Sequence, residues 1–179
     1  MKQHIVYLKK LEACQEAIEY ASQFKTLEEA WQKCERGDWM LWLAGRLSGN
    51  PGSDSRKKLV LAACACARLS LKYAKKGELR PLHAIETAEK WANGDTAITL
   101  GDVRKSADAA AAAAYAAYAA AYAAYAAYAA DAADAAAYAT YAATYAAAAG
   151  AARTETLKQC ADIVRGFYPH VLETTELKD

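Results

Sequence analysis

The sequence has few of the residues from which catalytic and metal sites are built. Its three histidines, His4, His83 and His170, lie far apart, and none has a partner at the spacing of a metal site. It contains no glycine pattern of a phosphate loop or a dinucleotide-binding turn. No segment alternates apolar and polar residues with the period of two that strands show. We therefore predict a non-enzymatic protein with no catalytic residue, no bound metal and no cofactor.

An excess of charge of one sign is also lacking. The chain has 22 basic and 21 acidic residues, so no strong field attracts nucleic acid or a membrane surface. The N-terminus, MKQHIVYLKK, has no apolar run long enough for a signal peptide. Five cysteines, an odd number lying mostly in helical patterns, predict small buried residues in a reducing compartment. We expect a cytoplasmic protein with no membrane association and no preference for DNA.

The dominant feature of the chain is an Ala/Tyr-rich element at 102–152. Residues 109–130 are all Ala or Tyr, and Ala is the best helix former. On an ideal helix the first tyrosines form one stripe, whereas Asp131, Asp134 and the later tyrosines fall on the opposite side. The element is therefore either one helix of about 48 residues or two helices that break near the aspartates.

The tyrosine stripe has two interpretations. It can pack between helices, or it can form an exposed aromatic surface that binds a partner, because Tyr is enriched at interfaces. The candidate partner-binding residues are Tyr118, Tyr122, Tyr125, Tyr128, Asp131 and Asp134.

The rest of the chain predicts further helices, and hence an all-α bundle that forms a single domain over 1–179. Apolar residues recur at helical spacing, and turn residues separate the segments. Thr26 with Glu29, and Thr99 with Asp102, are typical of helix starts. The expected helices are 3–22, 26–36 with Gly37 closing it, 39–47 with Asp38 as its cap, 56–76, 80–92, the Ala/Tyr-rich element and 154–166.

Two arginines stand in apolar helical segments. Arg46 shares a helix face with Trp39 and Trp42, and Arg68 follows a run of small apolar residues. An unpaired buried charge is costly, so each guanidinium must reach solvent, stack on an aromatic ring or meet a carboxylate. Glu86 is the carboxylate that we expect to meet Arg46 or Arg68.

Two short motifs resemble a known family. They are an Asp-Trp-x-x-Trp-Leu-x-x-Arg helix and an Arg-Pro-x-x-Ala-Ile-Glu-x-Ala helix, carried here by Asp38, Trp39, Trp42, Leu43, Arg46, Arg80, Pro81, Ala84, Ile85, Glu86 and Ala88. With the Ala-rich helix, this order is similar to the immunity-five-like group of immunity proteins from bacterial polymorphic toxin systems, also met in phage and prophage genomes. The resemblance covers about residues 11–165.

The resemblance implies an all-helical cytoplasmic protein that binds and neutralises a protein partner, and it transfers no catalytic residue. It also allows purely structural roles for the motif: Asp38 as a cap, Trp39 and Trp42 in the core, and Arg46 paired with Glu86. A phage-encoded inhibitor of a host defence protein would use the same physics.

Two other functions stay open at this point. One is a nucleotide-binding sponge, in which tyrosine rings stack on bases and arginines hold phosphates. Clustered arginines near exposed tyrosines would favour it, and arginines engaged with carboxylates would oppose it. The other is a structural module whose Ala-rich faces join several chains.

Overall fold

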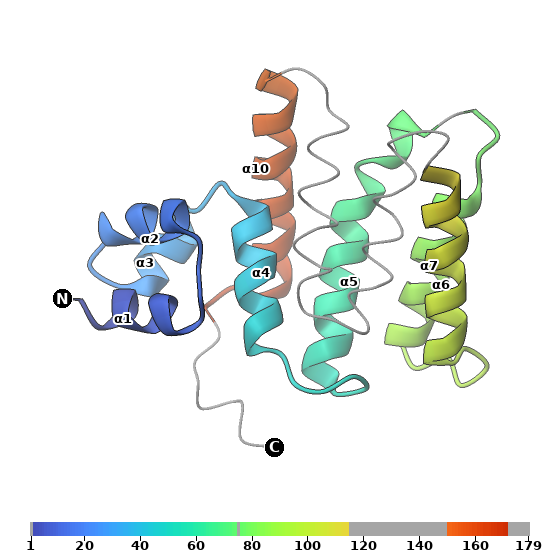
Figure 1. Ribbon diagram of the computed structural model, residues 1–179, viewed down its shortest axis with the longest axis horizontal. Helices are drawn as coiled ribbons and strands as arrows, with labels where there is room; N and C mark the ends of the chain where they lie inside the picture. The colour runs from blue at the N-terminus through green and yellow to red at the C-terminus, as the bar shows by residue number, and fades with distance from the viewer. Residues whose placement is uncertain (1, 75, 115–149, 172–179) are drawn as a thin grey trace.

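The computed structural model describes residues 2–74, 76–114 and 150–171. These ranges form helices and contain no strand, which confirms the all-α fold class (Figure 1). The helices are α1 Gln3–Lys10, α2 Gln15–Ser22, α3 Leu27–Lys33, α4 Gly37–Leu47, α5 Asp54–Arg68, the 3-10 turn η1 Leu71–Tyr73, α6 Arg80–Ala92, α7 Leu100–Ala114 and α10 Gly150–Phe167.

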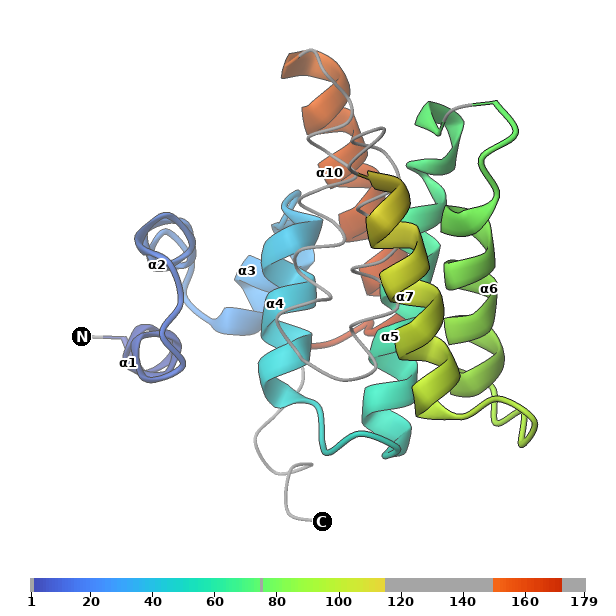
Figure 2. The same cartoon turned by 45° about the vertical axis from the view of Figure 1, so that its right-hand side comes forward.

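The described helices form a bundle with a smaller helical group beside it. Helices α4, α5, α6, α7 and α10 make the bundle, in which α10 contacts α4 and α5, and α6 contacts α5 and α7 (Figure 1). Helices α1 and α2 lie on the far side of α4 from α5, α6 and α7 (Figure 2). The largest fully buried side chains are Met40, Leu41, Leu59, Val60, Ile85, Val103 and Val164, so the core lies within the bundle.

Small residues place α5 at the centre of the bundle. Its segment Ala62, Ala63, Cys64, Cys66 and Ala67 is fully buried. Neighbouring helices cover this segment on most sides, as its run of residues that are apolar all round favours. The helix ends at Arg68 and not at the predicted residue 76. The Ser70 hydroxyl donates to the Ala67 carbonyl oxygen at 2.6 Å, a bond that competes with continued helix.

Two predicted helix starts are confirmed by their hydrogen bonds. The Thr26 hydroxyl oxygen accepts from the Glu29 amide at 3.0 Å, and the Glu29 carboxylate accepts from the Lys25 amide. At α7 the Thr99 hydroxyl oxygen accepts from the Asp102 amide at 3.2 Å, and the Asp102 carboxylate accepts from the Thr99 amide at 2.9 Å. Such reciprocal bonds satisfy donors that a helix start leaves unpaired.

The predicted first helix, 3–22, is two helices. The chain turns between Lys10 and Gln15, and Glu12 takes a left-handed backbone conformation with φ of 63°. That conformation costs a residue other than glycine about 1 kcal/mol. The turn lets Ile5 of α1 and Ile18 of α2 both reach the core, which a straight helix would prevent.

The predicted cap at Asp38 and helix end at Gly37 are wrong. Helix α4 begins at Gly37, its N-cap is Arg36, and Asp38 lies in its first turn. A carboxylate is favourable there because the helix dipole is positive at its N-terminus. Gly37 is needed for packing: a Cβ built on it would meet the Cβ of Cys160 and lie 2.7 Å from the Ala161 amide nitrogen on α10.

We predict that Gly37→Ala lowers the free energy of unfolding by about 1–3 kcal/mol, because the added methyl group overpacks the contact between α4 and α10. Gly166→Ala is the matched control, since nothing lies within 4 Å of its added Cβ. It should leave stability unchanged or raise it by up to about 1 kcal/mol. Urea unfolding followed by circular dichroism measures both. Equal stability of G37A and the wild type would contradict the packing argument.

The cysteines divide into four buried thiols and one exposed thiol. Cys34, Cys64, Cys66 and Cys160 are buried as expected, whereas Cys14 is exposed, so the expectation of burial is wrong there. Burial raises the pKa of Cys34 to about 11 and raises the pKa of Cys64. A buried and protonated thiol is a poor nucleophile.

We therefore predict that a maleimide labels the native protein once, at Cys14, and the urea-unfolded protein five times, since the sequence holds five cysteines. Mass spectrometry of the intact chain counts the labels. Cys14→Ser should abolish the native label and leave the other four for the unfolded chain. A second label of comparable rate on the native protein would show that a buried thiol is accessible.

Candidate functional site

Helix α3 is held against the C-terminal end of α10. The buried Trp31 indole N–H donates to the Tyr168 carbonyl oxygen at 3.0 Å. The Nη1 atom of Arg165 donates to the Cys34 carbonyl oxygen at 2.6 Å, and the Gln32 side-chain amide donates to the Pro169 carbonyl oxygen. These bonds join segments more than 130 residues apart and fix where α3 stands beside α10.

Between these helices and α4 lies an apolar pocket of about 50 Å³, which we call the Trp39/Trp42 pocket. Its lining residues are Leu8, Ala13, Ala17, Tyr20, Ala21, Leu27, Ala30, Trp31, Cys34, Trp39, Met40, Trp42 and Leu43. The Tyr20 hydroxyl donates to the Ala30 carbonyl oxygen at 3.2 Å, so its polar atom is already satisfied. A concave apolar surface of this size can accept a side chain of a partner, whereas small-molecule sites are usually several times larger.

A guanidinium covers Trp39. The Arg36 Cζ lies 4.1 Å from the centre of the Trp39 ring. The same guanidinium donates to the Asp38 carboxylate from Nε at 2.8 Å and from Nη2 at 2.5 Å. This two-point bond raises the pKa of Arg36. Asp38 therefore holds Arg36 in place over the indole.

A second guanidinium covers Trp42. The Arg46 Cζ lies 5.6 Å from the centre of the Trp42 ring, and its Nη2 lies 3.7 Å from a Glu12 carboxylate oxygen. The expectation that Arg46 would stack on a ring or meet a carboxylate is confirmed. Trp39 and Trp42 are both half-buried and pack against the core.

The prediction that Glu86 pairs with Arg46 or Arg68 is wrong. Glu86 is exposed on α6, whereas the Arg68 guanidinium donates to the Glu89 carboxylate at 2.8 and 2.6 Å. Glu86 and Glu89 are three residues apart on α6, and Glu89 is the one that faces α5. Sequence spacing alone does not show which of the two carboxylates does so. Arg80, the other motif arginine, donates to Glu78 and lies on the surface.

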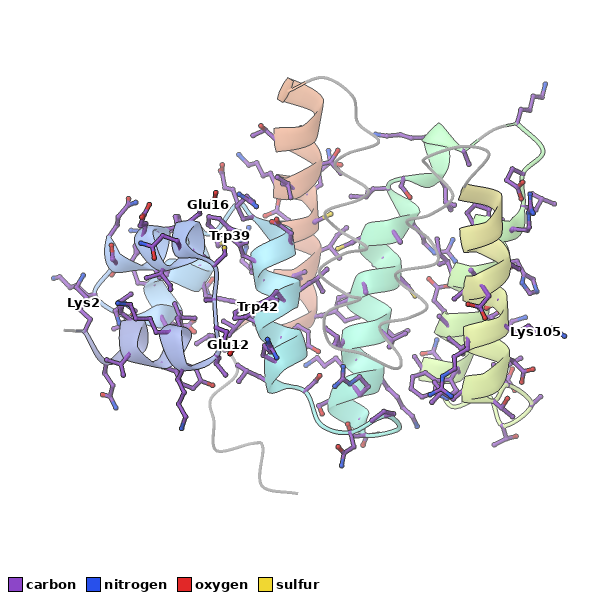
Figure 3. The ribbon with its side chains drawn as sticks, in the orientation of Figure 1. Lys2, Glu12, Glu16, Trp39, Trp42 and Lys105 are labelled. Atoms are coloured by element: carbon purple, nitrogen blue, oxygen red, sulfur yellow. The ribbon has the colours of Figure 1, made fainter. Side chains whose placement is uncertain are left out.

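Two carboxylates flank the tryptophans. Figure 3 shows Glu12 beside Trp42 and Glu16 beside Trp39. Glu12 pairs with Arg46, and Glu16 lies close enough to Arg36 to raise its pKa. We call Glu12, Glu16, Arg36, Asp38 and Arg46 the pocket rim. Sequence reasoning missed Glu12 and Glu16 because the turn that presents them was predicted as straight helix.

The remaining candidate residues of the sequence are not part of this geometry. Tyr118, Tyr122, Tyr125, Tyr128, Asp131 and Asp134 lie outside the described residues. Within the described ranges, no group of three or more His, Cys, Asp or Glu side chains could hold a metal ion. In the same ranges no helix has the length and apolar character needed to cross a membrane.

No family model, curated protein or solved structure matches this chain. The resemblance to immunity proteins therefore stays a prediction from its two motifs. All five residues of the first motif belong to the site: Trp39, Trp42 and Leu43 line the pocket, and Asp38 and Arg46 stand on its rim.

The pocket tyrosine yields a pH prediction. Burial, with the charges of Cys34 and Glu35, raises the pKa of Tyr20 to about 12. The unfolded chain ionises tyrosine near its ordinary pKa of about 10. Neutral Tyr20 therefore stabilises the fold fully below about pH 10, and this contribution is lost as the pH rises toward 12.

We expect the free energy of unfolding to fall between pH 10 and pH 12 more steeply for the wild type than for Tyr20→Phe. Urea unfolding at several pH values measures the slope. Tyr168, whose pKa burial also raises, contributes a decline that both proteins share. Parallel curves for the two proteins would mean that Tyr20 ionises in the fold as it does in water.

Proposed function

We propose that this protein is a non-catalytic binding protein that inhibits a toxin or another effector, and that the effector docks at the Trp39/Trp42 pocket. The observation that carries the proposal is an open apolar pocket lined by two half-buried tryptophans, each with an arginine over its ring. Trp, Tyr and Arg are the residues that dominate binding energy at protein interfaces.

The geometry of the rim supports a rigid docking site. Arg36 lies over Trp39 and is held by two hydrogen bonds to Asp38, whereas Arg46 lies over Trp42 and makes a longer ion pair with Glu12. A side chain that is already ordered loses little conformational entropy when a partner binds, so more of the contact energy appears as affinity.

The same contacts favour a protein partner over a nucleotide. A nucleotide sponge needs arginines that are available for phosphate, but Arg36 makes a two-point bond to Asp38 and Arg46 lies in a longer ion pair with Glu12. A base also needs more room than about 50 Å³, because a cavity of roughly 150 Å³ is the size that takes benzene. One aliphatic side chain fits this volume better.

Inhibition by occlusion is the mechanism that this site supports. When a side chain of the effector enters the pocket, α2 and α4 cover the effector surface around that side chain. This contact blocks the surface with no chemical step. The resemblance points the same way, since the motif that carries it supplies the walls and rim of the pocket. This function would place the protein in the cell that the effector attacks.

The test fills the pocket without touching the rim. Ala17, half-buried in the pocket wall on α2, is changed to Leu; Gln15→Leu introduces the same side chain at an exposed site on the same helix. Each tagged protein is used to capture partners from a lysate of the source cell. We expect the wild type and Q15L to retain the same stoichiometric protein, and A17L to bind it at least about tenfold more weakly.

Two readouts complete the test. The captured protein is purified, its affinity for the three chains is measured by calorimetry, and its own activity is assayed with and without the wild type. Equal affinity for A17L and the wild type would exclude the pocket as the docking site. A captured nucleotide without protein would point to the sponge, and a captured second copy of the chain to the structural module.

A further inference from the structure

We infer that the docking partner presents a basic amphipathic segment, with one aliphatic side chain flanked by lysine or arginine. This inference rests on the proposed function and names the chemistry of the partner at the same pocket. It follows from the size of the pocket and from the charges that surround it.

The pocket volume selects the side chain that enters. The pocket has a volume of about 50 Å³, which is a third of the roughly 150 Å³ that accommodates a benzene ring. This leaves room for the end of one branched aliphatic chain, such as that of leucine, isoleucine or valine. Aromatic walls on Tyr20, Trp31, Trp39 and Trp42 surround this space with carbon and offer an entering group little to hydrogen-bond.

The rim selects the charge of the flanking residues. Its two guanidiniums are both engaged: Arg36 makes a two-point bond to Asp38, and Arg46 stacks on Trp42 beside Glu12. Glu16 is exposed and forms no hydrogen bond or salt bridge within the part of the chain that the structure describes. Three carboxylates against two guanidiniums leave the rim with a net negative charge.

The carboxylates that remain accessible stand at both ends of the pocket mouth. The Glu12 side chain is 83% exposed and holds Arg46 only loosely, at 3.7 Å. Glu12 lies at the Trp42 end and Glu16 at the Trp39 end (Figure 3). Helix α2, with the sequence QEAIEYAS, adds Glu19 and carries no basic side chain. An incoming segment therefore meets an accessible carboxylate beside each of the two tryptophans that line the pocket.

A random peptide library displayed on phage tests this inference on the full chain. The wild-type protein is the bait, and selected peptides are synthesised and their affinities measured at low and at moderate salt. We expect enrichment of peptides with a Leu, Ile or Val within one helical turn of Lys or Arg. Their binding should weaken as salt rises, because salt screens exposed charge pairs.

Variants separate the rim from the pocket. The double variant Glu12→Gln, Glu16→Gln should weaken the selected peptides about threefold or more, as expected for the loss of two exposed charge pairs. Glu86→Gln is the matched control, since Glu86 is an exposed carboxylate on α6, remote from the pocket. It should leave binding unchanged. Circular dichroism establishes that all variants fold.

The outcomes distinguish this inference from the proposed function. Selection of acidic or uncharged peptides, or binding that A17L weakens and the double glutamine variant does not, would overturn the charge inference and leave the docking site standing. Peptides that bind A17L as well as the wild type would overturn both. A library that yields no enriched peptide would also overturn the inference, because it would show that no peptide side chain binds in the pocket.

Discussion

The site depends on the hydrogen bond that the buried Trp31 indole donates to the Tyr168 carbonyl oxygen. The helices before α4 are short, at 7–8 residues, and helices of that length are marginal by themselves. Helix α3 is held by contacts with the end of α10, where Arg165 also binds the Cys34 carbonyl oxygen, and α2 contacts α3. An unsatisfied buried carbonyl costs about 1–3 kcal/mol, so this junction resists separation. The pocket is the space that remains where α1 and α2 are held against α4.

The backbone at Gly37 and Glu12 shapes the pocket, because each position has a constraint that glycine meets most easily. Gly37 allows α4 to contact α10 at Cys160 and Ala161, and Trp39 and Trp42 of the same helix line the pocket. Glu12 takes a left-handed conformation that glycine would adopt more easily, and the turn it makes returns α2 toward α4. Glu12 adopts a conformation that is costly for a glutamate, and its 83% exposed carboxylate lies on the rim. These two features are more typical of a binding-site residue than of a simple loop residue.

Local chemistry predicts much of this fold, and distant contacts account for the rest. The caps at Thr26 and Thr99 follow from bonds within three residues, so the sequence alone predicts where α3 and α7 begin. The partner of Arg46 is Glu12, thirty-four positions away, and it depends on a turn that no glycine or proline marks. The pocket is likewise a product of the α3–α10 junction, which sequence periodicity does not encode. The tryptophans of the site could be singled out from sequence, but the cavity beside them could not.

The arginine–tryptophan pairs show why the motif has both a structural and a binding interpretation. Arg36 on Trp39 and Arg46 on Trp42 shield indole surface from water, and a shielded indole needs no partner for its stability. Both indoles also line a pocket that the chain itself leaves open. A structural role alone would favour a filled pocket, since a larger residue at Ala17 would bury the same rings at little cost. The small residues Ala13 and Ala17 keep the pocket open, and this favours a binding role for the surface they face.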